Sequence, residues 1–275
     1  GYGKPQVNGQ FVGFENYKII LTDPNFQEAL GHTLFVVVAS LVIQGPLAIL
    51  FALLLNQKFK GRALIRTLIF VPYVVSEVIV GTGWSLMLQP TGAVNAVLAK
   101  FGISGADWIA DPKIAIWTLM FIISWKYIGF AVILMIAGMQ SIPEDLYEAA
   151  KVDGAGFWRQ QWSITLPLLG PTIRMWAFMS IIGSLQLFDL VYIIWGQYVS
   201  STAGTSTMAT YMVREGRLAN NYGYGSAVAV VIFVISLVIA LTYQHIAMNR
   251  DLDGALTDGK RGKRSRGTIV TSEVA

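Results

Sequence analysis

The sequence predicts an all-α, polytopic membrane protein, and three features of its composition and pattern support this fold class. Hydrophobic residues make up 54% of the 275 residues and charged residues only 13%, about half of the roughly 25% found in soluble domains. Too few polar side chains remain to cover a globular surface, which favours lipid as the solvent. Five segments also reach the length of about 20 apolar residues that a bilayer-spanning helix needs. No cysteine is present, which excludes disulfides and thiol chemistry.

The five predicted spans are each uncharged or carry one ionisable residue. In chain order they are Leu34–Leu55, Leu68–Leu88 with one glutamate, Ile114–Met139 with one lysine, Met175–Trp195 with one aspartate, and Ser226–Ala247. A soluble helical protein would need a polar face on each of these helices, and none has one. Glycine and proline inside them, as at Gly45-Pro46 and Pro72, are tolerated because neighbouring helices satisfy the freed backbone groups.

Lysine and arginine in the connections predict which side of the membrane each connection faces. Thirteen of them lie in the links after the first and third spans and in the C-terminal tail, against six in the opposite connections, so the first side is expected to be cytoplasmic. Residues 1–33 then form an extracytoplasmic segment, with an interfacial helix interrupted at Asp23-Pro24. Residues 34–248 form a transmembrane domain, and residues 249–275 form a basic cytoplasmic tail. An outside N-terminus without a signal sequence leads us to expect a further helix upstream of Gly1.

A polar insert, residues 141–171, interrupts the apolar pattern in the third connection. Leu146–Val152 is predicted to form a short helix, and Gly154 permits a sharp turn after it. A second short helix is expected over Phe157–Thr165, ending before Pro167. This shape is typical of a docking element, but a loop that merely caps the bundle would have the same pattern. The residues alone do not decide between the two.

One motif inside this insert has fixed spacing. It reads EAA, three residues, G, nine residues, I, one residue, LP, and its residues are Glu148, Ala149, Ala150, Gly154, Ile164, Leu166 and Pro167. The motif resembles the signature loop of the membrane subunits of binding-protein-dependent ABC importers. The stretch SWKYIGFAVILMIAGMQSIPEDLYEAAKVDGA is similar to the sugar-permease, maltose-type branch of that family. The similarity extends over nearly the whole chain, from Phe11 to Tyr243.

This resemblance implies a type I importer permease with six helices, in the bacterial plasma (inner) membrane and with a cytoplasmic C-terminus. It implies four kinds of partner: a second homologous permease subunit, two cytoplasmic ABC ATPase subunits that bind ATP and Mg, an extracytoplasmic solute-binding protein, and a sugar substrate that is a di- or oligosaccharide. This chain would bind no cofactor or metal and would not be an enzyme by itself. The residues that would couple it to the ATPase are the seven of the motif together with Asp153. Many relatives have proline where Glu77 stands.

Ionisable residues inside predicted spans are costly in lipid, so each is a functional hypothesis. One helical stripe in the third span combines polar and aromatic side chains: Ile123, Lys126, Tyr127 and Phe130. A second stripe of small residues in the fourth span is Ser180, Gly183, Ser184 and Leu187, with Gln186 and Asp189 beside it. These residues and Glu77 are predicted to line a sugar pathway, in which hydroxyls find hydrogen bonds and CH faces stack on aromatic rings. The alternative is that Lys126 pairs with Glu77 or Asp189 to hold the bundle together.

Two further classes compete with an importer subunit. An ion-coupled secondary transporter would use Glu77, Lys126 and Asp189 as a relay, and a membrane scaffold would need no pathway. Neither requires an ATPase-docking loop.

Other motifs in the sequence do not support nucleotide binding, nucleic-acid binding or catalysis. GALTDGK at 254–260 approaches a phosphate-binding loop, but Arg261 replaces the required Ser or Thr and no strand precedes it. The basic tail lacks interleaved aromatic residues, so it indicates attraction to anionic lipid and no nucleic-acid partner. No set of residues suited to catalysis stands out.

Overall fold

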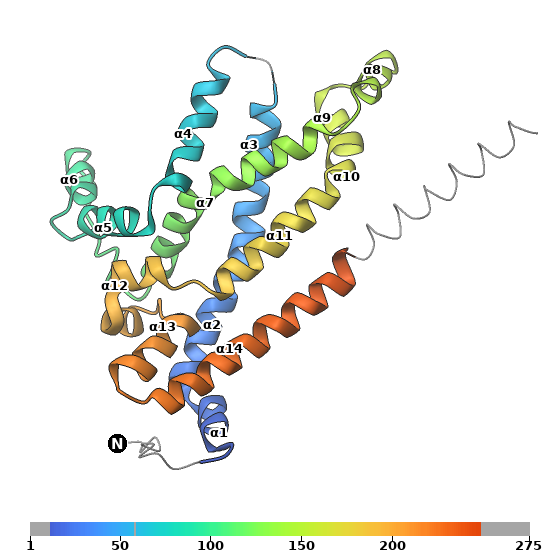
Figure 1. Cartoon of the computed structure of the whole chain (residues 1–275). Helices are drawn as coiled ribbons and strands as arrows, with labels where there is room; N and C mark the ends of the chain where they lie inside the picture. Colours follow the sequence, from blue (N-terminus) through green and yellow to red (C-terminus); the bar gives the residue numbers. More distant parts are fainter. Residues whose placement is uncertain (1–11, 58, 249–275) are drawn as a thin grey trace, which may run out of the picture.

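The computed structural model describes residues 12–57 and 59–248, and every regular element in those ranges is helical. The basic tail and the 254–260 motif lie outside the described residues. Figure 1 places the α8–α9 hairpin and the connection between α3 and α4 at one end of the molecule, and α1, α12 and α13 at the opposite end. The connections that carry Lys60 and Lys151 therefore share one end, which is the arrangement predicted from the charge pattern.

The first span is a continuous helix that begins at Pro24 and not at the predicted Leu34. It consists of α2 (Pro24–Ala39), the π-helical turn η1 (Ser40–Gln44) and α3 (Gly45–Leu55). The side chain of Asp23 accepts a hydrogen bond from the Asn25 N–H at 2.9 Å, and proline at the first helical position is favourable because it has no N–H to satisfy. Asp23-Pro24 thus starts the span, and α1 (Glu15–Thr22) lies directly before it.

The predicted span over Leu68–Leu88 is not one continuous helix, because two helices meet there at a bend of 96°. They are α4 (Arg62–Val74) and α5 (Glu77–Met87). The Ser76 hydroxyl caps α5 by accepting a hydrogen bond from the Ile79 N–H at 3.4 Å. The short helix α6 (Ala93–Lys100) follows.

The third and fifth predicted spans match long helices closely. They are α7 (Ala115–Gln140), and α14 (Tyr222–Tyr243) with η4 (Gln244–Met248). Together with Pro24–Leu55, these give three helices long and apolar enough to cross a membrane within the described residues, or up to five if each of two bent pairs counts as one span. Only 17% of the most apolar window of Tyr222–Ile246 lies inside the protein, so most of this helix is left to contact lipid or another chain.

The fourth predicted span, Met175–Trp195, is wrong in its second half. Here α11 (Gly170–Leu185) ends and a separate helix, α12 (Asp189–Thr202), begins. The second bent pair instead joins α11 to the segment Phe157–Leu168 at an angle of 64°. The remaining elements are α8 (Glu144–Val152), α9 (Phe157–Gln160), η2 (Gln161–Thr165), α10 (Leu166–Leu168), α13 (Met208–Val213) and η3 (Arg214–Leu218).

The helices pack around α7. Small residues permit this contact, since a Cβ atom on Gly129 would lie only 2.3 Å from the carbonyl oxygen of Ile69 in α4. On another side of α7, alanines 48 and 52 of α3 join Met135 and Trp176 in a buried apolar cluster. The bundle is therefore closely packed where α3 and α4 cross α7.

A buried polar cluster ties the start of α2 to the α13 end of the molecule. The Tyr211 hydroxyl donates a hydrogen bond to Asp23 Oδ2 at 2.7 Å and lies 2.8 Å from the Tyr224 hydroxyl. Burial, followed by these hydrogen bonds, raises the pKa of Tyr211 well above its ordinary range, so the hydroxyl stays protonated and remains a donor. The cluster holds three segments of the chain together at one point.

Candidate functional site

The first candidate site is the polar insert, which the structure forms as an exposed helical hairpin. Helix α8 begins after Pro143 with two acidic residues in its first turn and ends with Lys151 in its last turn, and it contains no buried residue. Both ends therefore carry the charge that the helix dipole favours. Most of the surface of α8 is therefore exposed, with only Tyr147 and Ala150 half-buried, which favours a docking element over a cap on the bundle.

A tight turn ends α8 at the position predicted from the glycine. Gly154 has a φ of +76°, the left-handed region that residues with a side chain seldom adopt. The N–H of Ala155 donates to the Ala150 carbonyl at 2.9 Å, and the N–H of Gly154 donates to the Lys151 carbonyl at 3.0 Å. These two bonds form a Schellman motif, which satisfies the last free carbonyls of the helix.

Side-chain hydrogen bonds hold the two arms of the hairpin together. The hydroxyls of Tyr147 on α8 and Thr165 on η2 lie 2.9 Å apart, and the Thr165 hydroxyl donates to Gln161 Oε1 at 2.8 Å. The Gln160 amide donates to the Ala155 carbonyl at 2.7 Å, which braces the turn. The second helix runs on to Leu168, past the predicted end before Pro167.

The structure brings the predicted coupling residues onto this hairpin. Glu148, Ala149, Asp153, Gly154 and Pro167 are exposed, and Ala150, Ile164 and Leu166 are half-buried. Large apolar side chains are also exposed here, among them Val152 at 89% and Trp162 at 69%. Apolar groups rimmed by charges on a protruding element indicate a surface that contacts another protein.

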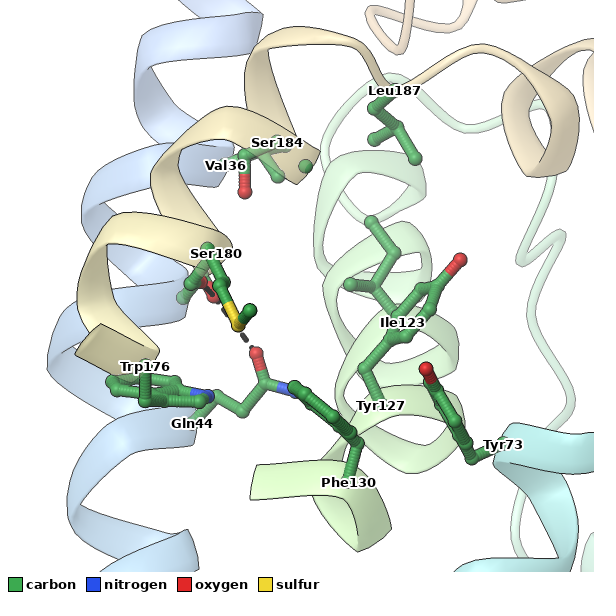
Figure 2. Close-up of a pocket in the computed structure, with 13 residues that line it drawn as sticks. Val36, Gln44, Tyr73, Ile123, Tyr127, Phe130, Trp176, Ser180, Ser184 and Leu187 are labelled. Atoms are coloured by element: carbon green, nitrogen blue, oxygen red, sulfur yellow. Dashed lines mark hydrogen bonds between the residues drawn. The ribbon is translucent and has the colours of Figure 1, made fainter. Parts of the chain in front are cut away.

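The second candidate site is a cavity of about 230 Å³ inside the bundle. Its walls come from α2, η1, α4, α7 and α11 and from Leu187, which lies between α11 and α12. The lining residues are Val36, Ser40, Gln44, Tyr73, Ile123, Tyr127, Phe130, Trp176, Met179, Ser180, Gly183, Ser184 and Leu187. Figure 2 shows the aromatic side chains of α4 and α7 on one side of this space and Ser180, Ser184 and Trp176 on the other.

The aromatic wall of the cavity is built from rings that contact one another. Tyr73 stacks on Phe130, with ring centroids 5.2 Å apart and an angle of 21° between the rings. Tyr73 also meets Tyr127 edge-on at 6.2 Å. Together these three rings present a continuous aromatic surface to the cavity.

The opposite wall carries the polar groups of the cavity, and part of it comes from the π-helical turn η1. The Ser40 hydroxyl lies 2.6 Å from that of Ser180 and donates to Gln44 Oε1 at 2.8 Å. Within the described residues the Gln44 amide nitrogen donates no hydrogen bond, so it is available to a solute. Turns of this wide type occur often at functional sites.

The predicted pathway residues divide into two groups. Ile123, Tyr127, Phe130 and Ser184 line the cavity, whereas Lys126, Glu77, Gln186 and Asp189 lie outside its lining. Lys126 is 2% exposed and points to the junction of α4 and α5, where its ammonium lies 3.9 Å from Glu77. Gln186 and Asp189 are exposed at the break between α11 and α12. Of the two partners suggested for Lys126, the structure therefore supplies Glu77.

Several lining residues were not identified from the sequence. Ser40 and Gln44 carried a signal, because they are the only side chains with hydrogen-bonding groups in Leu34–Leu55, and such groups inside a span suggest function. Tyr73 and Trp176 carried none, since aromatic residues near the ends of spans are common.

Comparisons with known proteins identify one family and several permease proteins that are similar to this chain. The model of the family described as "Binding-protein-dependent transport system inner membrane component" matches residues 44–250. The trehalose/maltose transport system permease protein of Thermococcus litoralis is 32% identical over 241 residues, covering 87% of this chain and 81% of that protein. The arabinooligosaccharides transport system permease protein of Bacillus subtilis is 32% identical over 234 residues, covering 84% of this chain and 74% of that protein.

A solved structure is similar in both fold and sequence. It is the crystal structure of a bacterial ABC transporter involved in the import of the acidic polysaccharide alginate, with a TM-score of 0.81 at 29% identity. The match covers 88% of this chain and 85% of that one. A second structure of such a transporter, in complex with an alginate pentasaccharide-bound periplasmic protein, gives a TM-score of 0.79 at 29% identity, over 86% of this chain and 83% of that one.

Proposed function

Because the chain belongs to the family of inner membrane components of binding-protein-dependent transport systems, we propose that its cavity is half of a translocation pathway for a sugar, a di- or oligosaccharide. The chain is a permease subunit of an ABC importer and is not itself the ATPase. It acts with a second permease, ATPase subunits and a solute-binding protein. It is embedded in the inner membrane with several spans.

The observation that carries the sugar assignment is the pairing of an aromatic wall with a polar wall. The rings of Tyr73 and Phe130 offer flat faces to the CH groups of a sugar ring. Ser180 and Gln44 offer a hydroxyl and an amide to its hydroxyls. Ligand sites of this type combine mostly apolar walls with a few polar groups that fix orientation. The names of the two similar permeases, for trehalose/maltose and for arabinooligosaccharides, support the same substrate class.

The pathway assignment is tested by truncating its aromatic wall. We expect Phe130→Ala or Tyr127→Ala to lower sugar uptake by the assembled importer at least tenfold. Each substitution removes one of the three aromatic rings that a sugar ring would contact in the cavity. The matched control is Phe121→Ala, because Phe121 lies on the same helix, is 56% exposed and does not line the cavity. Its uptake should stay near wild type. Normal uptake by both cavity variants would refute the assignment.

The ion-coupled alternative has no support in the comparisons, whose relatives are permeases of ABC importers. Lys126 and Glu77 are engaged with each other and with the Val75 carbonyl at the junction of α4 and α5. The family relationship also indicates ATP as the energy source.

The helical hairpin is the proposed docking site for the ATPase, which binds ATP and Mg. Glu148 supplies a polar contact, Ala149 and Ala150 permit close approach, and Gly154 forms the turn. The hairpin continues through α10 into α11, which contributes Ser180 and Ser184 to the cavity. Movement of the ATPase subunits is thereby transmitted to one wall of the pathway. The hairpin end is assigned to the cytoplasm, together with the C-terminus.

A further inference from the structure

The break between α4 and α5 leaves backbone carbonyls without helical partners. Helix α4 ends at Val74, and both Val75 and Ser76 are extended, with ψ angles of 138° and 149°. The last carbonyls of a helix have no N–H partner within that helix. In a membrane no water is available to replace that partner, so a broken span must satisfy these groups from elsewhere in the protein.

Lys126 of α7 supplies the missing donor. Its ammonium donates to the Val75 carbonyl at 2.7 Å and to the Pro72 carbonyl at 3.4 Å. The side chain is 2% exposed, and its charge is balanced by Glu77, 3.9 Å away on the first turn of α5. A cation at the end of α4 and an anion at the start of α5 both have the sign that the helix dipoles favour.

The same junction fixes the aromatic wall of the cavity. Tyr73 follows Pro72 directly, and it is the residue of α4 that lines the cavity. Tyr127 follows Lys126 directly, and its hydroxyl donates a hydrogen bond to Glu77. In Figure 2, Tyr73 and Tyr127 point toward the same space from α4 and α7. The position of both rings therefore depends on how α4 ends and α5 begins.

We propose that Lys126 is a positioning residue that holds the broken span in its bent geometry and thereby sets the aromatic wall of the translocation pathway. It does so through the carbonyls of Pro72 and Val75 and through Glu77. This proposal rests on the assignment of the cavity to the pathway. The lysine itself does not touch the solute.

The test measures the geometry of the break directly. The chain has no cysteine, so spin labels can be placed on single cysteines introduced at Leu68 in α4 and Leu86 in α5, which are 62% and 60% exposed. Pulsed electron–electron double resonance on the assembled importer then gives the distribution of distances between the two spin labels across the bend. We compare Lys126→Met, which keeps the length of the side chain but cannot donate, with Lys126→Arg, which retains donors.

We expect Lys126→Met to broaden or shift the distance distribution. Uptake should fall by about tenfold, the factor that corresponds to the free-energy cost of leaving one buried carbonyl without a hydrogen-bond partner. Lys126→Arg should restore the narrow distribution and most of the uptake. An unchanged distribution in Lys126→Met would overturn the proposal, as would a changed distribution with normal uptake. If the methionine variant does not assemble, the same comparison is made with Lys126→Gln, and an unchanged distribution there has the same meaning.

The pathway assignment fails separately from this proposal. Phe130→Ala removes a lining ring but leaves the bonds of Lys126 to Pro72, Val75 and Glu77 in place, so it should lower uptake and leave the distance distribution as in wild type. Normal uptake by Phe130→Ala would count against the pathway, whereas an unchanged distance in Lys126→Met counts against the role of the lysine.

Discussion

Replacing Gly154 by alanine isolates one property of the docking hairpin, its left-handed turn. An added Cβ atom would meet no other atom within 4 Å, so the substitution causes no steric clash. What changes is the backbone cost, because Gly154 has a φ of +76°. Gly156 is a matched control in the same turn, since its Cβ would also meet nothing within 4 Å and its φ is −67°.

The size of the effect follows from that one dihedral angle. A residue with a Cβ atom in the left-handed region costs about 1–2 kcal/mol relative to glycine. This corresponds to a factor of about 5–30 in the ratio of the native turn to its alternative conformations. If the ATPase binds only the native turn, its apparent affinity for the permease falls by up to this factor. Alanine at Gly156 adopts its ordinary φ without strain and should change the affinity less than twofold.

The assay is titration of the purified permease pair with the ATPase subunits, followed by solute-stimulated ATP hydrolysis in the reconstituted importer. We expect Gly154→Ala to weaken binding and to reduce stimulated hydrolysis, while membrane insertion is unaffected because the hairpin lies outside the bundle. If both alanine variants bind equally well, or if Gly156→Ala is the more damaging, the turn does not position the docking surface.

Two further predictions concern packing and orientation. Gly129→Ala should prevent α4 from packing on α7 and lower the melting temperature, because its Cβ would lie 2.3 Å from the Ile69 carbonyl oxygen. The control is Gly183→Ala in the cavity lining, whose Cβ would meet nothing within 4 Å and which should leave the melting temperature unchanged. Equal melting temperatures for the two variants would refute the close contact. A single cysteine at Val152, which is 89% exposed, should react with a membrane-impermeant maleimide in inside-out vesicles and not in intact cells; labelling in intact cells would reverse the assigned orientation.

Local sequence signals were sufficient to predict the structure where it depends on a single helix or a single turn. The apolar run Ile114–Met139 predicts α7 to within one residue at each end. Gly154 marks the left-handed turn, because only glycine adopts that conformation without strain. The hairpin was predictable for the same reason, since its turn and its two short helices depend on residues close in sequence.

The broken span was harder to predict, although part of its signal was local. Pro72 lacks an N–H, and Ser76 followed by Glu77 is a typical start of a helix. Average hydropathy over Leu68–Leu88 hides these signals because both helices are apolar. The direction of the bend depends on a donor from another helix, Lys126, which is remote in sequence.

The sequence by itself determined the membrane class, the long helices, the exposed hairpin and the family, because lipid solvation and short-range backbone geometry act within one segment. The tertiary structure decided which side chains share a cavity. On a helical wheel Lys126 belongs to the same stripe as Ile123, Tyr127 and Phe130, yet it turns to α4 while the other three line the cavity. Neighbouring positions on one helix face different partners when a second helix crosses between them, and only the packing of α4 on α7 fixes where that crossing lies.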